Sequence, residues 1–203
     1  MSDSPSASVC LDPAIIPLQA SHPDWIQAVQ ADFPAFLRDH ASCEKKASGM
    51  ALNVASHYPD QPRLLSAMTD LAVEELGHYR EVIRIMLDRN ITPGPDTKDP
   101  YVNELNGLIR RGSESFLLDR LLVGAVVERR GAERFAIVAD AVSDTDLGSF
   151  YRAITASESR HWQLFIDLAG DFFTAEVVTE RFNQLSVAEH GIIAALPLRA
   201  ALH

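Results

Sequence analysis

The chain has 203 residues, 47% of them hydrophobic and 23% charged, which is typical of a globular protein long enough to form one sizeable domain. The formal net charge of −10 argues against a broad basic surface for nucleic acid, although it is compatible with a local basic patch. The sequence shows no eighteen-residue apolar run and no secretory signal, and its two cysteines, Cys10 and Cys43, are too few for a disulfide framework, so we expect a cytoplasmic protein with no membrane partner.

Prolines divide the first half of the chain into helical segments. The Ser- and Pro-rich residues 1–20 predict an irregular lead-in. Pro34 and Pro62 can each occupy the first turn of a helix, so we expect helices that run to about His57 and Arg89. The following segment, NITPGPDTKDP, holds three prolines and a glycine and cannot form a long helix.

Two more long helices are expected at 113–141 and 146–169, followed by another from about 174 toward 196. Short turns within each pair of long helices predict antiparallel hairpins, while the connection over 90–112 is long enough to cross the bundle. One long crossover between two hairpins is typical of ferritin-like bundles. We therefore expect an all-α, ferritin-like four-helix bundle with additional N- and C-terminal helices, forming a single domain over residues 1–203.

Two Glu-x-x-His motifs lie on the second and fourth long helices, Glu75-Leu-Gly-His78 and Glu158-Ser-Arg-His161. Residues three apart share one helix face and can reach one metal ion. Each motif alone is weak support for a metal site, because such tetrads arise often by chance. The pair is stronger, since the motifs stand 83 residues apart and an aromatic residue follows each histidine.

Two further glutamates complete the pattern of a two-metal carboxylate site, which takes one from each remaining helix. Glu44 precedes Glu75 by 31 residues, and Glu128 precedes Glu158 by 30. All four acids lie on apolar stripes of their helices, so they should face a dry core. Buried carboxylates need compensating positive charge, which two divalent metal ions supply. The predicted metal ligands are Glu44, Glu75, His78, Glu128, Glu158 and His161.

Four carboxylates and two imidazoles suit iron or manganese, and the ligands alone do not separate the two metals. Glu74 and Glu133 lie close to predicted ligands, but charged neighbours favour solvated positions for both. His40, one turn before Glu44, could support that ligand, although a surface position is the expected one. Cys43 is expected to be a small buried residue and not a ligand.

Three runs of the chain carry a family resemblance: ASCEKKASGMALNVASHYPDQPRLLSAMTDLAVEELGHYREV, LLVGAVVERRGAERF and FYRAITASESRHW. They resemble the bacterial tRNA 2-methylthio-isopentenyladenosine hydroxylases of the ferritin-like diiron superfamily. The resemblance covers roughly residues 10–200 and includes all six predicted ligands in order. It implies an oxygen-dependent monooxygenase with two non-haem iron ions, O2 as co-substrate and an external electron donor. The implied reaction places a hydroxyl on the isopentenyl group of the modified adenosine beside the tRNA anticodon.

A tRNA substrate requires Lys and Arg near the mouth of the pocket, where they meet phosphates. The sequence candidates are Lys45, Lys46, Arg110, Arg111, Arg129, Arg130, Arg152 and Arg160. A solvated helix face is the more ordinary place for any of these pairs. Three aromatic residues could line a prenyl pocket, although core packing is their default: Phe116, Tyr151 and Trp162.

Without the resemblance, the residues indicate a dinuclear metal site for redox chemistry and no particular substrate. A ferritin-type ferroxidase, a peroxide-consuming enzyme and a metal-free structural bundle are the alternatives. A rubrerythrin-like peroxidase normally carries a Cys-x-x-Cys module, which this sequence lacks. A metal-free bundle would leave the inward-facing glutamates unexplained.

Overall fold

The computed structural model describes residues 15–113 and 115–203, and every regular element in these ranges is a helix. The predicted lead-in over 1–20 falls partly outside the described residues, and its described part is not helical. The helices are α1 (Trp25–Ala31), α2 (Phe33–His57), α3 (Pro62–Asp88), α4 (Pro100–Gly107), α5 (Phe116–Ala141), α6 (Thr145–Gly170) and α7 (Ala175–Ala195).

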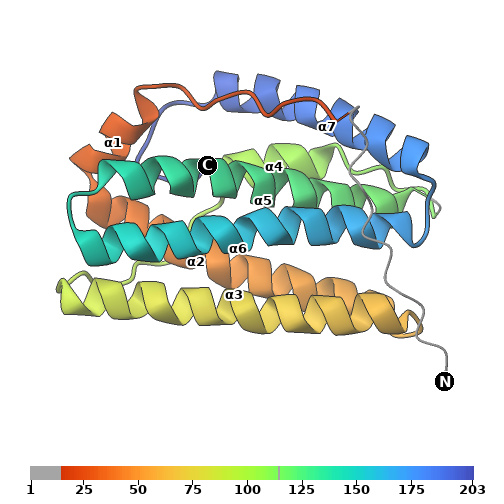
Figure 1. The fold of residues 1–203 in the computed structure, drawn as a ribbon, viewed down its shortest axis with the longest axis horizontal. Coiled ribbons are helices and arrows are strands. Elements are labelled where there is room, and N and C mark those ends of the chain that lie inside the picture. Colours follow the sequence, from red (N-terminus) through yellow and green to blue (C-terminus); the bar gives the residue numbers. More distant parts are fainter. Residues whose placement is uncertain (1–14, 114) are drawn as a thin grey trace.

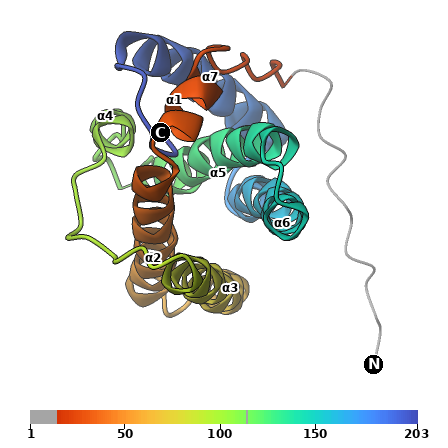
Figure 2. The same cartoon turned by 90° about the vertical axis from the view of Figure 1, so that its left-hand side faces the viewer.

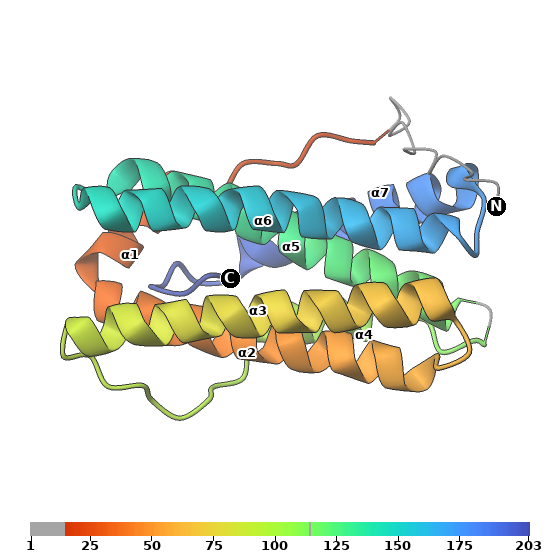
Figure 3. The ribbon, with the colours of Figure 1, turned by 60° about the horizontal axis from the view of Figure 1, so that its bottom comes forward.

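The four long helices form two antiparallel hairpins, α2 with α3 and α5 with α6, which lie side by side (Figure 1). Seen along the bundle, α1 and α7 cover the outer side of α5, and α4 lies beside this layer (Figure 2). The crossover from α3 to α4 runs along the outside of α2 (Figure 3), where the Arg38 side chain donates to the Thr92 carbonyl at 2.9 Å. The prediction of an all-α, ferritin-like bundle with extra terminal helices is confirmed.

Local signals explain where the helices begin and end. Pro34 and Pro62 occupy the first turns of α2 and α3, as expected. The Asp144 side chain caps α6 by accepting from two backbone N–H groups at 3.0 Å. α3 ends at Asp88, and the left-handed φ of 56° at Asn90 lets the Ile91 N–H bond back to the Met86 carbonyl.

The structure differs from the prediction in the crossover, which contains the short helix α4. Asp99 caps this helix by accepting from the N–H groups of Tyr101 and Val102, and Pro100 fills its first position. Pro100, the third proline of this segment, was expected only to break a helix, but it starts one. α5 begins at Phe116, three residues later than expected, and Ser115 makes no side-chain cap bond.

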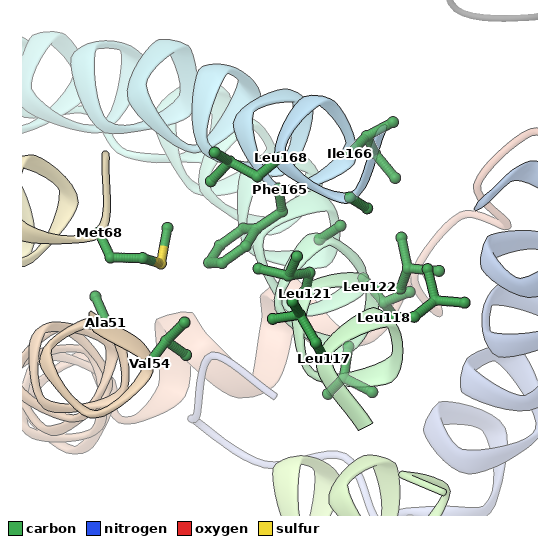
Figure 4. Close-up of a cluster of buried hydrophobic side chains, with 14 of the residues drawn as sticks. Ala51, Val54, Met68, Leu117, Leu118, Leu121, Leu122, Phe165, Ile166 and Leu168 are labelled. Atoms are coloured by element: carbon green, nitrogen blue, oxygen red, sulfur yellow. The ribbon is translucent and has the colours of Figure 1, made fainter. Parts of the chain in front are cut away.

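Apolar side chains pack at both ends of the bundle and leave its middle for polar residues. One cluster joins α2, α3, α5 and α6, where Met68 and Val54 point toward Phe165 and Leu121 (Figure 4). The other cluster includes Trp25, Phe36, Phe135 and Tyr151. Along each long helix, the six predicted metal ligands fall between these clusters. No helix in the described ranges has the length and apolarity needed to cross a membrane.

Replacing Asp119 with Ala should lower the free energy of unfolding by about 3 kcal/mol, because it leaves a buried ion network without its anion. The fully buried Asp119 carboxylate accepts from Arg110 at 2.7–3.0 Å and from Arg181 at 2.9 Å, which ties the crossover and α7 to α5. Urea unfolding at neutral pH measures the loss. Ala at the exposed Asp70 is the control and should change stability by less than about 0.5 kcal/mol.

The same interaction has a defined pH dependence. Burial opposes the charge of Asp119, but the hydrogen bonds from Arg110 and Arg181 outweigh it and lower the pKa to about 2. Since the pKa is lower in the folded state, the contribution to stability is present above the unfolded value of about 3.9 and is lost as the pH falls through 2. An Asp119→Ala variant as stable as wild type at pH 7 would contradict this assignment.

Candidate metal centre

The six predicted ligands converge in the middle of the bundle, one or two from each long helix. Their coordinating atoms form two overlapping groups, and within each group all atoms lie within 4.8 Å of one another. Glu44 and His78 complete the first group, Glu128 and His161 complete the second, and Glu75 and Glu158 belong to both. All of these side chains except His78 are buried, and the side chain of His78 is 14% exposed.

Each histidine faces its carboxylate partners through Nδ1. His161 Nδ1 lies 2.8 Å from Glu75 Oε1, and His78 Nδ1 lies 3.4 Å from Glu75 Oε2 and 3.6 Å from Glu44 Oε2. The i, i+3 spacing of each Glu-x-x-His motif brings its two side chains to the same helix face, as predicted. Glu75 thus stands between the two histidines.

Four buried atoms of this cluster make no hydrogen bond of suitable geometry, although two of them, Glu75 Oε1 and His161 Nδ1, lie 2.8 Å apart. They are Glu75 Oε1, His78 Nδ1, Glu158 Oε1 and His161 Nδ1. A buried polar atom without a partner costs about 1–3 kcal/mol, so a cluster of four requires an explanation. Oxygen and nitrogen lone pairs that converge on a shared space fit the donor set of two divalent metal ions.

The electrostatics of the cluster also favour cations. Burial, together with repulsion from neighbouring carboxylates, raises the pKa of Glu44 and of Glu128 well above the ordinary value. Burial lowers the pKa of a histidine, but the surrounding carboxylates outweigh it and raise the pKa of His78 to about 10 and that of His161 to about 11. The site therefore concentrates negative charge that protons or metal ions must offset.

His40 supports Glu44 from inside the bundle, which corrects the expected surface position. Its Nε2 lies 2.6 Å from Glu44 Oε1, its Nδ1 lies 3.3 Å from the Tyr151 hydroxyl, and the residue is fully buried. Burial and the charge of His78 lower the pKa of His40 to about 3, so the ring is neutral. The four-residue spacing between His40 and Glu44 places both on one face, but a single sequence does not show which way that face points.

Glu74 is a residue that the sequence did not select, because its charged neighbours suggested full solvation. Its Oε2 lies 3.3 Å from His161 Nε2, and its Oε1 lies 4.0 Å from His78 Nε2. Glu74 also accepts hydrogen bonds from Ser157 and, at 2.9 Å, from Arg160. It thus sits behind both imidazoles, and its i, i+4 spacing to His78 was the signal that could have found it.

A cavity of about 1180 Å³ connects the carboxylates to the surface. Glu44, Glu75, Glu128 and Glu158 lie at its inner end, and its walls come from α2, the crossover with α4, and α5. The apolar lining includes Met50, Val102, Ile109, Phe116 and Val127. Of the three aromatic candidates, only Phe116 lines the cavity, whereas Tyr151 is buried against His40 and Trp162 stacks on Phe182.

Four cationic side chains also line the cavity, and we call them the rim cations: Lys46, Lys98, Arg111 and Arg120. The first three are exposed and Arg120 is half-buried. Lys46 donates to the Thr97 carbonyl at 2.7 Å and Arg120 to the Asn53 side chain at 2.9 Å. Within residues 15–113 and 115–203, no carboxylate lies within ion-pair distance of a rim cation.

The structure separates the cations that the sequence had grouped together. Lys46 and Arg111 line the cavity, but their neighbours Lys45 and Arg110 pair with Asp96 and Asp119. The other four candidates lie away from the cavity. Arg130 is buried against Glu189, Arg129 lies over the Trp162 ring, Arg152 contacts Ser149 and Arg160 pairs with Glu74.

Comparisons with known proteins agree with this architecture. The structure superposes on a protein described as "Protein 43 with aldehyde deformylating oxygenase activity from Synechococcus" with a TM-score of 0.86 and 31% sequence identity, covering 91% of this chain and 93% of that one. A tRNA 2-(methylsulfanyl)-N(6)-isopentenyladenosine(37) hydroxylase from Pseudomonas putida is 38% identical over 148 residues, which are 73% of this chain and 72% of that protein.

The hydroxylase of the same description from Salmonella typhimurium is 34% identical over 178 residues, which are 83% of this chain. The match spans only 62% of that relative, less than two thirds of its length. The family model described as tRNA-(MS[2]IO[6]A)-hydroxylase (MiaE) matches residues 11–203. The chain therefore belongs to the MiaE family of tRNA hydroxylases.

Proposed function

We propose that the chain is an oxygen-dependent diiron monooxygenase that hydroxylates the isopentenyl group of 2-methylthio-isopentenyladenosine next to the tRNA anticodon. One observation carries the proposal: six metal-binding side chains converge inside the bundle, and their four carboxylates lie at the inner end of a cavity whose outer part holds four cations. The relatives named above supply the substrate class. Since the substrate is a tRNA, the chain would work in the cytoplasm.

The two overlapping ligand groups, which share Glu75 and Glu158, would hold two iron ions. When bound, such a pair supplies the electron transfer by which O2 is reduced and one oxygen atom enters a C–H bond. The second oxygen atom leaves as water. Its reduction takes two electrons and two protons, and the electrons must come from an external donor.

The cavity lining suits two parts of the proposed substrate, its prenyl group and its phosphates. Met50, Ile109 and Phe116 offer an apolar wall for a prenyl group and exclude water from the inner end. The rim cations lie where the phosphates of an anticodon loop would enter, and the acidic remainder of the surface would keep nucleic acid from other faces. Because the proposed phosphate contacts are confined to the rim cations, a tRNA substrate is compatible with the net charge of −10.

The experiment that tests the proposal uses the iron-loaded, reduced full chain with O2, an electron source and tRNA that carries the modification. Nucleoside mass spectrometry should show the gain of one oxygen atom in the modified adenosine. The His78→Ala variant is the negative control, since it lacks one ligand. Iron oxidation or peroxide consumption with no oxygen in the nucleoside would instead favour a ferroxidase or a peroxide-consuming enzyme.

Replacing Glu74 with Gln should weaken metal binding about 10- to 100-fold, because a partner that orients a histidine ligand is lost. Gln keeps the size of the side chain but cannot offer a charged acceptor to His161 Nε2 at 3.3 Å. Titration of the metal-free protein with Fe²⁺ under anaerobic conditions measures the change. Ala at the exposed Asp70 on the same helix should leave the affinity unchanged, and an unchanged affinity in Glu74→Gln would show that Glu74 does not orient the ligand.

A further inference from the structure

A second cluster of metal-binding side chains lies in the cavity wall, separate from the six-residue centre. Cys43 of α2, Asp99 just before α4, and His203 of the C-terminal tail bring a sulfur, a carboxylate oxygen and an imidazole nitrogen within 4.8 Å of one another. All three residues line the cavity, and none of them belongs to the other two ligand groups. They are 56 to 160 residues apart in the sequence, so no local motif reveals them.

His203 is the most deeply buried member of this cluster. The residue is only 6% exposed, whereas Cys43 and Asp99 are half-buried. His203 Nδ1 faces Asp99 Oδ2 at 3.1 Å, so the nitrogen and the carboxylate oxygen lie at about the spacing of two ligands of one ion, and the imidazole would then carry its proton on Nε2.

The surrounding contacts hold this arrangement in place. The Leu202 N–H donates to Asp39 at 2.7 Å and the Leu202 carbonyl accepts from Arg134 at 2.6 Å, so the tail is fixed on both sides. The His203 ring stacks on Tyr101 with a centroid distance of 4.5 Å. Because the histidine is oriented before any ligand arrives, binding would require little ordering of the chain.

The local charge also suits a cation. Asp99 and the neighbouring Asp39, whose Oδ2 lies 3.8 Å from Cys43 Sγ, place two carboxylates at the cluster. Of the neighbouring cations, Arg199 lies 3.9 Å from Asp99 Oδ1 and donates to the His203 carbonyl, while Lys46 donates to the Thr97 carbonyl. A divalent ion bound by the thiolate and these groups would therefore be in a net negative environment.

We propose that Cys43, Asp99 and His203 form a mononuclear site for a thiophilic divalent cation of the Zn²⁺ class. One sulfur, one nitrogen and one oxygen donor are a typical zinc ligand set, and hard cations such as Mg²⁺ avoid thiolate. Tetrahedral zinc places its ligand atoms about 3.3–3.8 Å apart, so the observed cluster needs only a small contraction. The fourth position faces the cavity. The ion would join α2, the crossover and the tail.

The test is a Co²⁺ titration of the chelator-treated full chain, because Co²⁺ substitutes for Zn²⁺ and gives an intense near-ultraviolet charge-transfer band only with a thiolate ligand. The six-residue centre contains no cysteine, so Co²⁺ bound there gives no such band. We expect one thiolate-bound Co²⁺ per chain, displaced by Zn²⁺. The band should disappear in Cys43→Ser and persist in Cys10→Ser, the matched control for the other cysteine.

Two further variants make the proposal falsifiable. His203→Ala should weaken Zn²⁺ binding at least 10-fold, while Glu75→Ala should leave the thiolate band intact, which separates this site from the proposed function. Absence of the band in wild type, its persistence in Cys43→Ser, or an unchanged Zn²⁺ affinity in His203→Ala would each overturn the proposal. Far-ultraviolet circular dichroism of each variant shows whether a lost band reflects a lost ligand or a lost fold.

Discussion

Replacing Glu75 with Ala should reduce the iron content of the reconstituted chain from about two ions to nearly none. Glu75 belongs to both ligand groups and faces His161 at 2.8 Å and His78 at 3.4 Å. Its loss would remove a ligand that both groups share and would leave the two histidines with fewer carboxylate neighbours. Elemental analysis after iron loading and desalting measures the ions that remain on each chain.

Variants of the other glutamates make this result specific. Glu44→Ala and Glu128→Ala each remove a ligand from only one group, so each should retain more iron than Glu75→Ala, about one ion per chain. Glu81 lies on α3, the helix of Glu75, but it pairs with Arg84 at 2.8 Å on the exposed side. Its replacement by Ala should leave the iron content unchanged. Wild-type iron in Glu75→Ala would show that the six residues are not the metal site.

The bundle could be predicted because its determinants are local. Prolines in first turns, a proline-rich break and short connections fix the order of helices, and one long crossover then leaves few arrangements. The helix α4 was missed for a physical reason: it has only eight residues, and Asp99 and Pro100 at its start read equally well as turn residues. Tertiary packing against α5 and α7 selects the helix, and that packing is not visible in the sequence.

The six candidate ligands could be selected because helical periodicity places them, one turn apart or at matched offsets, on faces that are otherwise apolar. This reasoning did not select Glu74 as part of the site, and it placed His40 at the surface. Glu74 looks solvated from its own helix, but α6 brings His161 and Ser157 to it. His40 has the right spacing to Glu44, but whether it is buried depends on Phe135 and Tyr151 from the other hairpin.

The cations were the least predictable feature, since their roles depend on partners distant in the sequence. Arg110 and Arg111 look alike in the sequence, yet Asp119 holds the first and the second lines the cavity. Lys98 was not selected at all, because only the path of the crossover brings it to the same cavity as Arg111. A charge is therefore a candidate for nucleic-acid contact only after its internal ion pairs are known.

The double variant Lys98→Ala/Arg111→Ala should bind tRNA about 50-fold more weakly than wild type at 0.1 M salt, because each phosphate contact contributes a factor of about 5–8 through counterion release. Both side chains are exposed, line the cavity and have no ion-pair partner in the described ranges. The slope of log K against log salt should become shallower by about 1.4–1.8. Fluorescence anisotropy with an anticodon stem-loop, repeated over a range of salt concentrations, measures both quantities.

The matched control is Arg80→Ala/Arg152→Ala, which changes the net charge equally but alters two exposed arginines outside the cavity. If the rim cations bind phosphates, the control should keep at least a third of the wild-type affinity and an unchanged salt slope. Equal losses in the two double variants would instead mean that tRNA responds to the total charge of the protein. The metal centre is untouched in both variants, so their iron content should equal that of wild type, and any loss of hydroxylation at low tRNA concentration should be recovered when tRNA is saturating.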